Sequence, residues 1–207
     1  MTDWFSITSG VRQGCVLSSL LFIAHMDKIT QESNSDNDEI NELLFVDDQC
    51  LIHQNEQDLQ HHIDTLNKNC VKHDMKINNT KTEIMNMGRK HNNLDIHVNG
   101  TKINQVKEFK YLGSIFTEDG RLDREIEARV QKANAVTYQL APLLRHPQIS
   151  QAAKQQIINS IFIPTLCYQS QTWAMSKAQS QKITTWEMRC LRKVTNNTRK
   201  TESPTSA

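Results

Sequence analysis

Residues 43–52 read LLFVDDQCLI, and the fold that we expect for the chain follows from this segment. Two short apolar runs flank an Asp-Asp pair, a pattern that predicts a β-hairpin with Asp47 and Asp48 at its turn. Such a hairpin holds two carboxylates side by side on a rigid support, and carboxylate oxygens are the ligands that hard divalent cations prefer. Aspartate is also common at turns for backbone reasons, so a purely conformational role for the pair is an alternative.

Periodic apolar segments on both sides of the hairpin predict helices and further short strands. Apolar residues from Val16 to Ile29 have the spacing of a buried helix, and the polar stretch 31–41 predicts an exposed loop. Asn55 can cap a second helix, which we expect to end near Asp74. The following pattern predicts short strands, namely MKIN, TEIMNM, LDIHVNGTKI with a turn at Asn99-Gly100, and EFKYLGSIF.

The C-terminal part of the chain is predicted to be helical. Residues 121–194 contain apolar residues at helical spacing, and residues 195–207 form a polar tail that we expect to be flexible. The predicted fold class is therefore α+β, with short antiparallel strands and helices at 1–120 and an all-helical unit at 121–194. Trp173 and Trp186 are expected to pack in the helical unit in preference to stacking on bases.

Charge is divided unequally along the chain. The 207 residues carry a net charge of +1, but residues 1–120 contain 11 Lys and Arg against 18 Asp and Glu, whereas residues 121–207 contain 13 against 5. A basic helical surface is typical of proteins that bind a phosphate backbone. Solvated helix faces are the alternative explanation.

The composition also bears on location. The longest apolar run, Val16–Ala24, is interrupted by Ser18 and Ser19 and is shorter than the roughly 20 residues of a membrane span, so we expect no membrane partner. No basic segment followed by an apolar one is visible near Met1, so we expect no signal peptide. The expected location is intracellular, in the cytoplasm or the nucleus, and the protein is not expected to be secreted.

Three further motifs accompany the Asp-Asp hairpin. GVRQGCVLSSLLF stands at 10–22, KIN at 76–78 is followed by Lys81-Thr82, and FKYLG stands at 109–113. With FVDD at 45–48, these motifs resemble, in their order and spacing, the reverse transcriptases of non-LTR (LINE-type) retrotransposons. The resemblance covers the C-terminal part of the palm of that family, at 1–120, and a helical thumb-like region to about residue 194. It implies an RNA-directed DNA polymerase with an RNA template, a DNA primer and deoxynucleotides as partners and substrates.

The resemblance implies a role for each matching residue. Asp47 and Asp48 match the catalytic pair of the family, which holds Mg²⁺ ions that activate the primer 3′-hydroxyl and steady the leaving pyrophosphate. Gln13 and Gly14 match residues that face the incoming nucleotide and the template. Lys81 matches a palm lysine that neutralises or protonates the pyrophosphate, although a solvated lysine at a strand edge is an equal alternative.

Two larger sets complete the predicted site. The family's primer grip is matched by a strand for which packing of aromatic residues against the core is an equally good explanation. Its residues here are Phe109, Tyr111, Leu112 and Gly113. Basic residues of the helical half are expected to contact the nucleic-acid backbone, namely Arg121, Arg124, Arg129 and Lys132.

Departures from the family pattern bear on activity. Ser19 stands where the family has proline, which removes no ligand. The chain begins almost at the Gln-Gly motif, so we expect the preceding palm strand, with a further aspartate, and the fingers to be missing. Asp3 lacks the D-x-x-x-A-F-D-like context of that aspartate. We therefore expect an incomplete Mg²⁺ site and little or no polymerisation from this chain alone.

Three alternatives to this interpretation stay open. The first is a non-catalytic nucleic-acid-binding module that uses the basic helical half. The second is an active polymerase whose remaining part is encoded upstream, and the third is a polypeptide that does not fold stably, because a palm without its central strand leaves an unpaired edge.

The histidines do not predict a zinc site. His61 and His62 lack the i, i+4 pairing with other ligands that a helical zinc site requires, and we expect them on the surface of the second helix.

Overall fold

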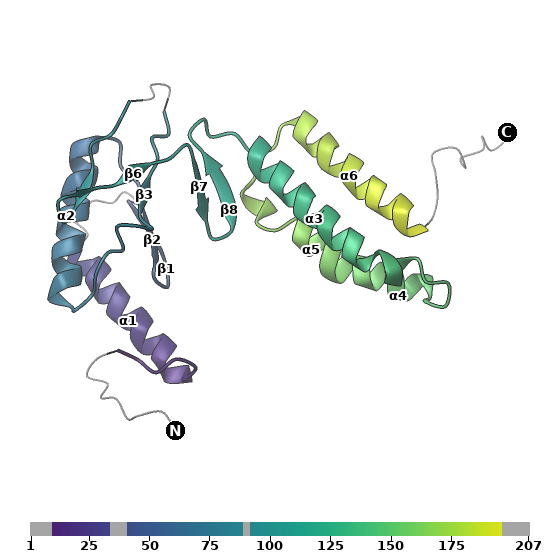
Figure 1. The fold of residues 1–207 in the computed structure, drawn as a ribbon, viewed down its shortest axis with the longest axis horizontal. Helices are drawn as coiled ribbons and strands as arrows, with labels where there is room; N and C mark the ends of the chain where they lie inside the picture. Colours follow the sequence, from purple (N-terminus) through teal and green to yellow (C-terminus); the bar gives the residue numbers. More distant parts are fainter. Residues whose placement is uncertain (1–9, 34–40, 89–91, 196–207) are drawn as a thin grey trace. The chain divides into compact units, whose positions relative to one another are not determined.

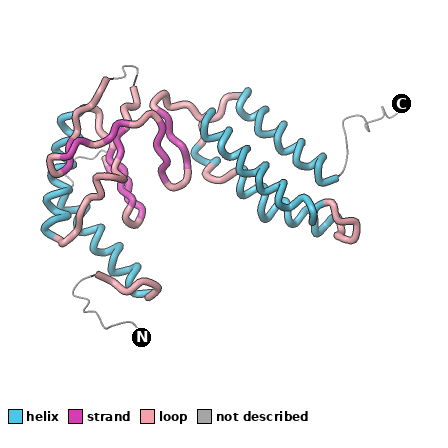
Figure 2. Tube along the Cα trace, in the orientation of Figure 1, coloured by secondary structure: helices cyan, strands magenta, loops and turns pink. Residues whose placement is uncertain are grey.

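The computed structural model describes residues 10–33, 41–88 and 92–195, which form two compact units (Figure 1). Unit 1 ends at Val106 and unit 2 begins at Lys107, and residues 87–88 belong with unit 2. Helices combined with short, mostly antiparallel strands confirm the predicted α+β class (Figure 2). Within the described part of the chain, no helix is both long enough and apolar enough to cross a membrane.

Unit 1 is built on two helices that pack against each other, α1 (Val16–Ser33) and α2 (Glu56–Lys72). The β1–β2 hairpin (Glu42–Phe45 and Asp48–Leu51) lies between them in the sequence. Four two-residue strands follow, namely β3 (Glu83–Ile84) paired in parallel with β6 (Asn104–Gln105), and β4 (His97–Val98) paired with β5 (Thr101–Lys102). The core has two clusters, one around Ile96 and Val98 and the other around Ile29 and Leu66.

The ends of α2 follow the capping residues in the sequence. The Asn55 side chain accepts a hydrogen bond from the Asp58 N–H at 2.8 Å, which satisfies one of the free donors of the first turn. The helix ends at Lys72, and Asp74 has a φ of 57°. Both predicted ends of this helix are confirmed.

The first helix is less buried than predicted. Only Met26, Ile29 and Ser33 are buried in α1, because the core cluster shared with α2 covers only the C-terminal half of the helix. In the N-terminal half, Val16 is 87% exposed and Leu20 is 62% exposed. The prediction of a helix is confirmed, and the prediction that its whole apolar face is buried is wrong.

The strand predictions are partly corrected. MKIN is not a strand. The Asn78 side chain accepts hydrogen bonds from the N–H groups of Thr80 and Lys81, so the backbone forms a turn and does not pair with another strand. TEIMNM contributes only the two residues of β3. The predicted turn at Asn99-Gly100 is confirmed, since both residues have positive φ and join β4 to β5.

The stretch EFKYLGSIF forms a hairpin and not a single strand. β7 (Glu108–Tyr111) pairs with β8 (Ser114–Thr117), and Leu112 and Gly113 form the turn with φ values of 48° and 86°. Positive φ at both central positions is the signature of the two-residue turns that match strand twist. The glycine signals this turn in the sequence, whereas leucine at the other position conceals it.

Unit 2 combines this hairpin with helices. Its helices are α3 (Asp123–Leu144), α4 (Gln151–Ile157), the π-helical turn η1 (Ile158–Phe162), α5 (Ile163–Leu166), the 3-10 turn η2 (Ser170–Thr172) and α6 (Lys177–Thr195). The core is formed by apolar residues from α3, α4, η1, α5 and α6, among them Ile126, Ile158 and Leu166. Trp173 and Trp186 are half-buried against this core, as predicted.

The π-helical turn has a local cause. Pro164 has no N–H group, so the Ser160 carbonyl cannot accept the usual i to i−4 hydrogen bond. The N–H of Ile163 instead donates to the Ile158 carbonyl, five residues back. This bond widens the helix just before α5.

Two isoleucines of α1 provide a matched test of the packing of unit 1. Ile29 is 0% exposed and Ile23 is 51% exposed. We expect Ile29→Ala to lower the free energy of unfolding of unit 1 by about 2–5 kcal/mol, because it leaves a cavity in the core. Ile23→Ala should change it by no more than about 0.5 kcal/mol. Urea unfolding followed by hydrogen exchange of α1 and α2 measures both, and equal effects would contradict the packing.

Candidate functional site

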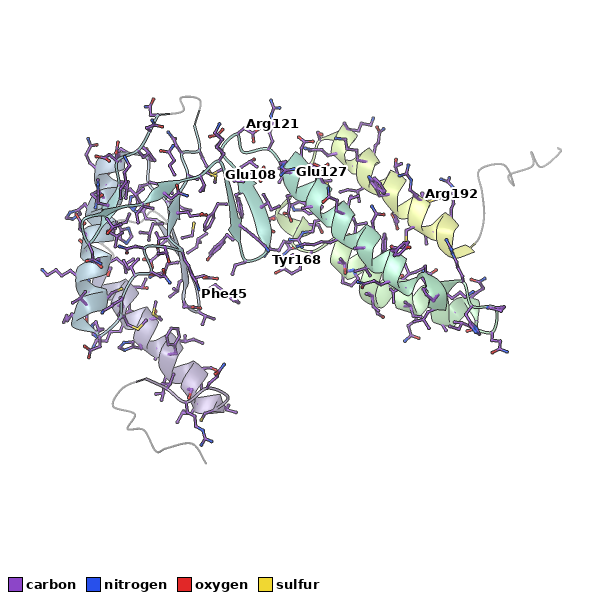
Figure 3. The ribbon with its side chains drawn as sticks, in the orientation of Figure 1. Phe45, Glu108, Arg121, Glu127, Tyr168 and Arg192 are labelled. Atoms are coloured by element: carbon purple, nitrogen blue, oxygen red, sulfur yellow. The ribbon has the colours of Figure 1, made fainter. Side chains whose placement is uncertain are left out.

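The predicted hairpin is confirmed, but its turn lies one residue earlier than expected, so that Asp47 is in the turn and Asp48 begins β2. Phe45 pairs with Asp48 across the strands, so Val46 and Asp47 are the two central residues of the turn. Phe45 projects from the end of β1 (Figure 3), and Asp47 and Asp48 are both exposed. Among the described residues, neither carboxylate takes part in an ion pair, so both are free to bind a cation.

The turn of this hairpin is strained at Val46. Its φ of 57° lies in the left-handed region, where a β-branched residue is a genuine outlier. A left-handed conformation costs a non-glycine residue about 1–2 kcal/mol. Residues held in this way concentrate at functional sites, where the surroundings enforce the geometry. The strain therefore directs attention to the tip that carries the two aspartates.

Glu42 holds the base of the hairpin. Its Oε1 accepts a hydrogen bond from Gln49 Nε2 at 2.6 Å, across the two strands, and one from Thr30 Oγ1 of α1 at 3.2 Å. Its Oε2 is buried without a hydrogen-bond partner and lies 3.7 Å from Nε2 of His62 on α2. One carboxylate thus ties β1 to β2 and to both helices of unit 1.

His62 is buried, which corrects the prediction that it lies on the helix surface. Its Nδ1 is 2.8 Å from Nε2 of His53, and burial together with the His62 ring lowers the pKa of His53. His61 is exposed, as predicted. The sequence holds a signal for the burial of His62, because it lies three residues after Leu59 and four before Leu66, on the apolar face of α2.

The remaining predicted residues of unit 1 lie in two exposed turns. Gln13 and Gly14 form the turn that directly precedes α1, and the φ of 84° at Gly14 favours glycine. Lys81 is exposed and ends the Asn78 turn just before β3. No hydrogen bond or ion pair joins its side chain to the two aspartates within the described ranges.

The two aspartates fit part of a magnesium site. Exposed carboxylate oxygens are suitable ligands for Mg²⁺, which usually binds one or two carboxylates and keeps several waters. In the described part of the chain, no cluster of three or more His, Cys, Asp or Glu side chains could hold a metal ion. Asp47 and Asp48 are two candidate ligands of a magnesium site, and the described residues provide no third ligand beside them.

The predicted primer-grip residues lie in the β7–β8 hairpin of unit 2. Phe109 pairs with Phe116 and Tyr111 with Ser114, while Leu112 and Gly113 form the tip. The four predicted residues are all half-buried, with their side chains or backbone partly open to solvent. Gly113 packs against Tyr168, whose ring would be 3.6 Å from a Cβ at that position.

The predicted basic set divides into exposed and buried members. Arg121 and Lys132 are exposed, and Arg121 lies 3.7 Å from Asp119. Arg124 is exposed but pairs with Glu108 at 2.6 Å and with Glu127 at 3.5 Å.

Arg129 does not belong with the exposed members. It is 5% exposed and forms a 2.6 Å ion pair with Glu125, which is 2% exposed. A side chain in this position cannot reach a phosphate backbone, so its predicted role is wrong. The helical periodicity places Arg129 three residues after Ile126 and four before Ala133, on the buried face of α3.

Comparison with known proteins identifies the family. The family model described as reverse transcriptase (RNA-dependent DNA polymerase) matches residues 2–116, a range that includes the Gln-Gly turn, the Asp-Asp hairpin and most of the β7–β8 hairpin. The chain therefore belongs to the reverse transcriptase family. No curated protein and no solved structure matches it.

The surroundings of Glu42 predict a loss of stability in acid. Burial raises the pKa of Glu42, but the His62 ring and the hydrogen bond from Gln49 outweigh it, so the pKa lies below its ordinary value of 4.5. A depressed carboxylate pKa stabilises the fold above pH 4.5, and this contribution is lost as pH falls through the folded value. We expect Glu42→Gln to lower the stability of unit 1 near pH 7 by about 1–3 kcal/mol and to flatten its decline in acid.

The measurement is urea unfolding of unit 1 between pH 7 and pH 3. Glu83→Gln is the matched control, because Glu83 is an exposed glutamate of the same unit. A decline of equal steepness in the Glu42→Gln variant and the native protein would show that the carboxylate does not stabilise the hairpin.

Proposed function

We propose that this chain is the C-terminal palm and thumb portion of the reverse transcriptase of a non-LTR (LINE-type) retrotransposon. The observation that carries the proposal is the exposed, strained Asp47-Asp48 tip in a chain of the reverse transcriptase family. The ordered Gln-Gly, Lys-Ile-Asn and Phe-Lys-Tyr-Leu-Gly motifs support the assignment to LINE-type elements. Residues 1–120 correspond to the palm, and the primer grip lies near the end of this range. The helices from 121 to 194 correspond to the thumb.

The proposed chemistry depends on positioning and charge. Asp47 and Asp48 would hold Mg²⁺, which would supply activation of the primer 3′-hydroxyl and neutralisation of the leaving pyrophosphate. The turn at Gln13 and Gly14 presents an amide side chain and an open backbone to the nucleotide and the template. Lys81 carries a positive charge for the pyrophosphate. No side chain forms a covalent intermediate in this mechanism.

We further propose that the chain does not polymerise by itself. The sequence contains no second acidic motif of the D-x-x-x-A-F-D kind, so it offers Asp47 and Asp48 without the further aspartate that the family resemblance implies. The hairpin also exposes consecutive apolar residues on both faces, from 36% at Leu44 to 57% at Phe45. Runs of this kind are typical of strands covered on both faces. A further polypeptide surface that covers the hairpin and supplies a carboxylate accounts for both features.

Primer extension tests this proposal. We expect the purified chain to incorporate no deoxynucleotide into a DNA primer annealed to an RNA template in the presence of Mg²⁺, because one metal ligand is lacking. The control is the same chain with Asp47→Ala. Incorporation by the native chain that is abolished by Asp47→Ala would contradict the proposed inactivity and would support an active polymerase.

The second candidate function is a nucleic-acid-binding module without chemistry. The exposed basic residues Arg121, Arg124 and Lys132 favour it, since they lie in or next to α3, and membership of the family implies RNA and DNA partners. Binding of this kind depends on the phosphate backbone and therefore weakens as the salt concentration rises.

Charge reversal measures the contribution of these residues. We expect Arg121→Glu and Lys132→Glu each to weaken binding of a primed RNA–DNA duplex and to reduce the slope of log Kd against log salt by about 1. Lys177→Glu, an exposed lysine of α6 outside the proposed set, is the matched control. Affinity that does not change with salt, or equal effects of all three reversals, would exclude this surface.

A further inference from the structure

The tip of the β7–β8 hairpin requires external support. Leu112 has a φ of 48° and Gly113 a φ of 86°, and the turn between them closes the Tyr111–Ser114 pair. Leucine rarely adopts a left-handed conformation without help from its surroundings. A two-stranded hairpin is also marginal in water unless it packs against another element. The position of this tip is therefore set by whatever its backbone contacts.

The contacts of the tip come from helical elements of unit 2. The Leu112 carbonyl accepts a hydrogen bond from the Tyr168 hydroxyl at 2.9 Å. The Gly113 carbonyl accepts one from Arg129 Nη2 at 2.6 Å, and the N–H of Ile115 donates to Glu125 Oε2 at 2.8 Å. Three backbone groups at or beside the turn are thus held by side chains of α3 and of the segment after α5.

Glu125 and Arg129 form the centre of this support. Arg129 Nε donates to Glu125 Oε1 at 2.6 Å, and the same oxygen accepts from Ser114 Oγ at 3.3 Å. The Arg129 guanidinium lies over the Tyr168 ring, 4.4 Å from its centroid. Both ionised groups are almost fully buried, and each is satisfied by the other and by the hairpin. A buried, paired charge of this kind permits few other arrangements, because any displacement leaves a charge without its partner.

We propose that Glu125 and Arg129 are positioning residues that fix the tip of the primer-grip hairpin on the helices of unit 2. This inference rests on the proposed function for the hairpin. Their burial prevents both side chains from touching nucleic acid, so they act through the backbone of residues 112–115. The primer-contacting tip then moves with α3, and the helical unit determines where the primer is held.

Two variants and a control separate this role from general stability. Arg129→Gln removes the charge and the fork of hydrogen-bond donors. Tyr168→Phe removes only the hydroxyl that binds the Leu112 carbonyl, so it tests the support even if Arg129→Gln folds poorly. Asp123→Asn is the control, because it removes an exposed ion pair, 3.6 Å from Lys182, in the same unit.

The first readout is hydrogen exchange of the full-length chain. The Ile115 N–H donates to Glu125. We expect it to exchange at least tenfold faster in Arg129→Gln, whereas the amides of α6 keep their rates. The Asp123→Asn variant should exchange like the native chain. Unchanged exchange of Ile115 in Arg129→Gln would overturn the proposed support.

The second readout is photocrosslinking to a DNA primer annealed to an RNA template. A photoreactive residue is placed at Lys110, in the hairpin, or at Gln131, on α3; both positions are exposed. We expect the ratio of Lys110 to Gln131 crosslinking to fall at least fivefold in Arg129→Gln and about twofold in Tyr168→Phe. A ratio that stays at the native value while Ile115 exchanges faster would overturn the positioning role and leave a purely structural one.

The same experiment distinguishes failure of the proposed function. If the native chain crosslinks from Gln131 but never from Lys110, the hairpin does not contact the primer, and the positioning role is overturned with it. Faster exchange of the Ile115 N–H in Arg129→Gln would still show that Arg129 and Glu125 stabilise the backbone of the hairpin tip. A native crosslink at Lys110 that weakens relative to Gln131 in both variants, and more in Arg129→Gln than in Tyr168→Phe, would support the inference.

Discussion

A buried carboxylate ties each of the two hairpins that carry candidate site residues to the helices beside it. Glu42 joins the Asp-Asp hairpin to α1 and α2, and Glu125 joins the β7–β8 hairpin to α3. Each hairpin has only two strands and little apolar cover, so neither could keep one position in water by its ladder alone. The geometry of both tips therefore depends on charged side chains that are taken out of solvent, and a buried charge accepts only the arrangement that satisfies it.

The two carboxylates are satisfied to different degrees. Glu125 accepts hydrogen bonds from Arg129, Ser114 and the Ile115 N–H, so both of its oxygens have partners. Glu42 leaves one oxygen facing the His62 ring without a hydrogen bond. Unit 2 consequently holds its hairpin by a carboxylate whose two oxygens are both hydrogen-bonded, and unit 1 by a carboxylate of which only Oε1 is hydrogen-bonded.

Unit 1 exposes a large part of its apolar surface. The first half of α1 and the tip of the β1–β2 hairpin are exposed to solvent, although most of their residues are large and apolar. This exposed apolar surface supports the proposal that a further polypeptide surface covers the hairpin. The two aspartates lie at the end of the same hairpin, so whatever covers the apolar faces also lies close to the candidate metal ligands.

Local sequence determined the helices, the Asp-Asp hairpin and the Asn99-Gly100 turn, because periodicity, caps and turn residues act within a few positions of the chain. The motifs also determined the family and the candidate residues Asp47 and Asp48. The burial of His62 and Arg129, the exposure of Val16 and the turn that begins at Leu112 depend on tertiary contacts. Burial of a charge depends on partners such as Glu42 or Gly113, which lie 20 or 16 positions away, and a strained leucine depends on Tyr168. These contacts exist only once the chain has folded, so no local pattern records them.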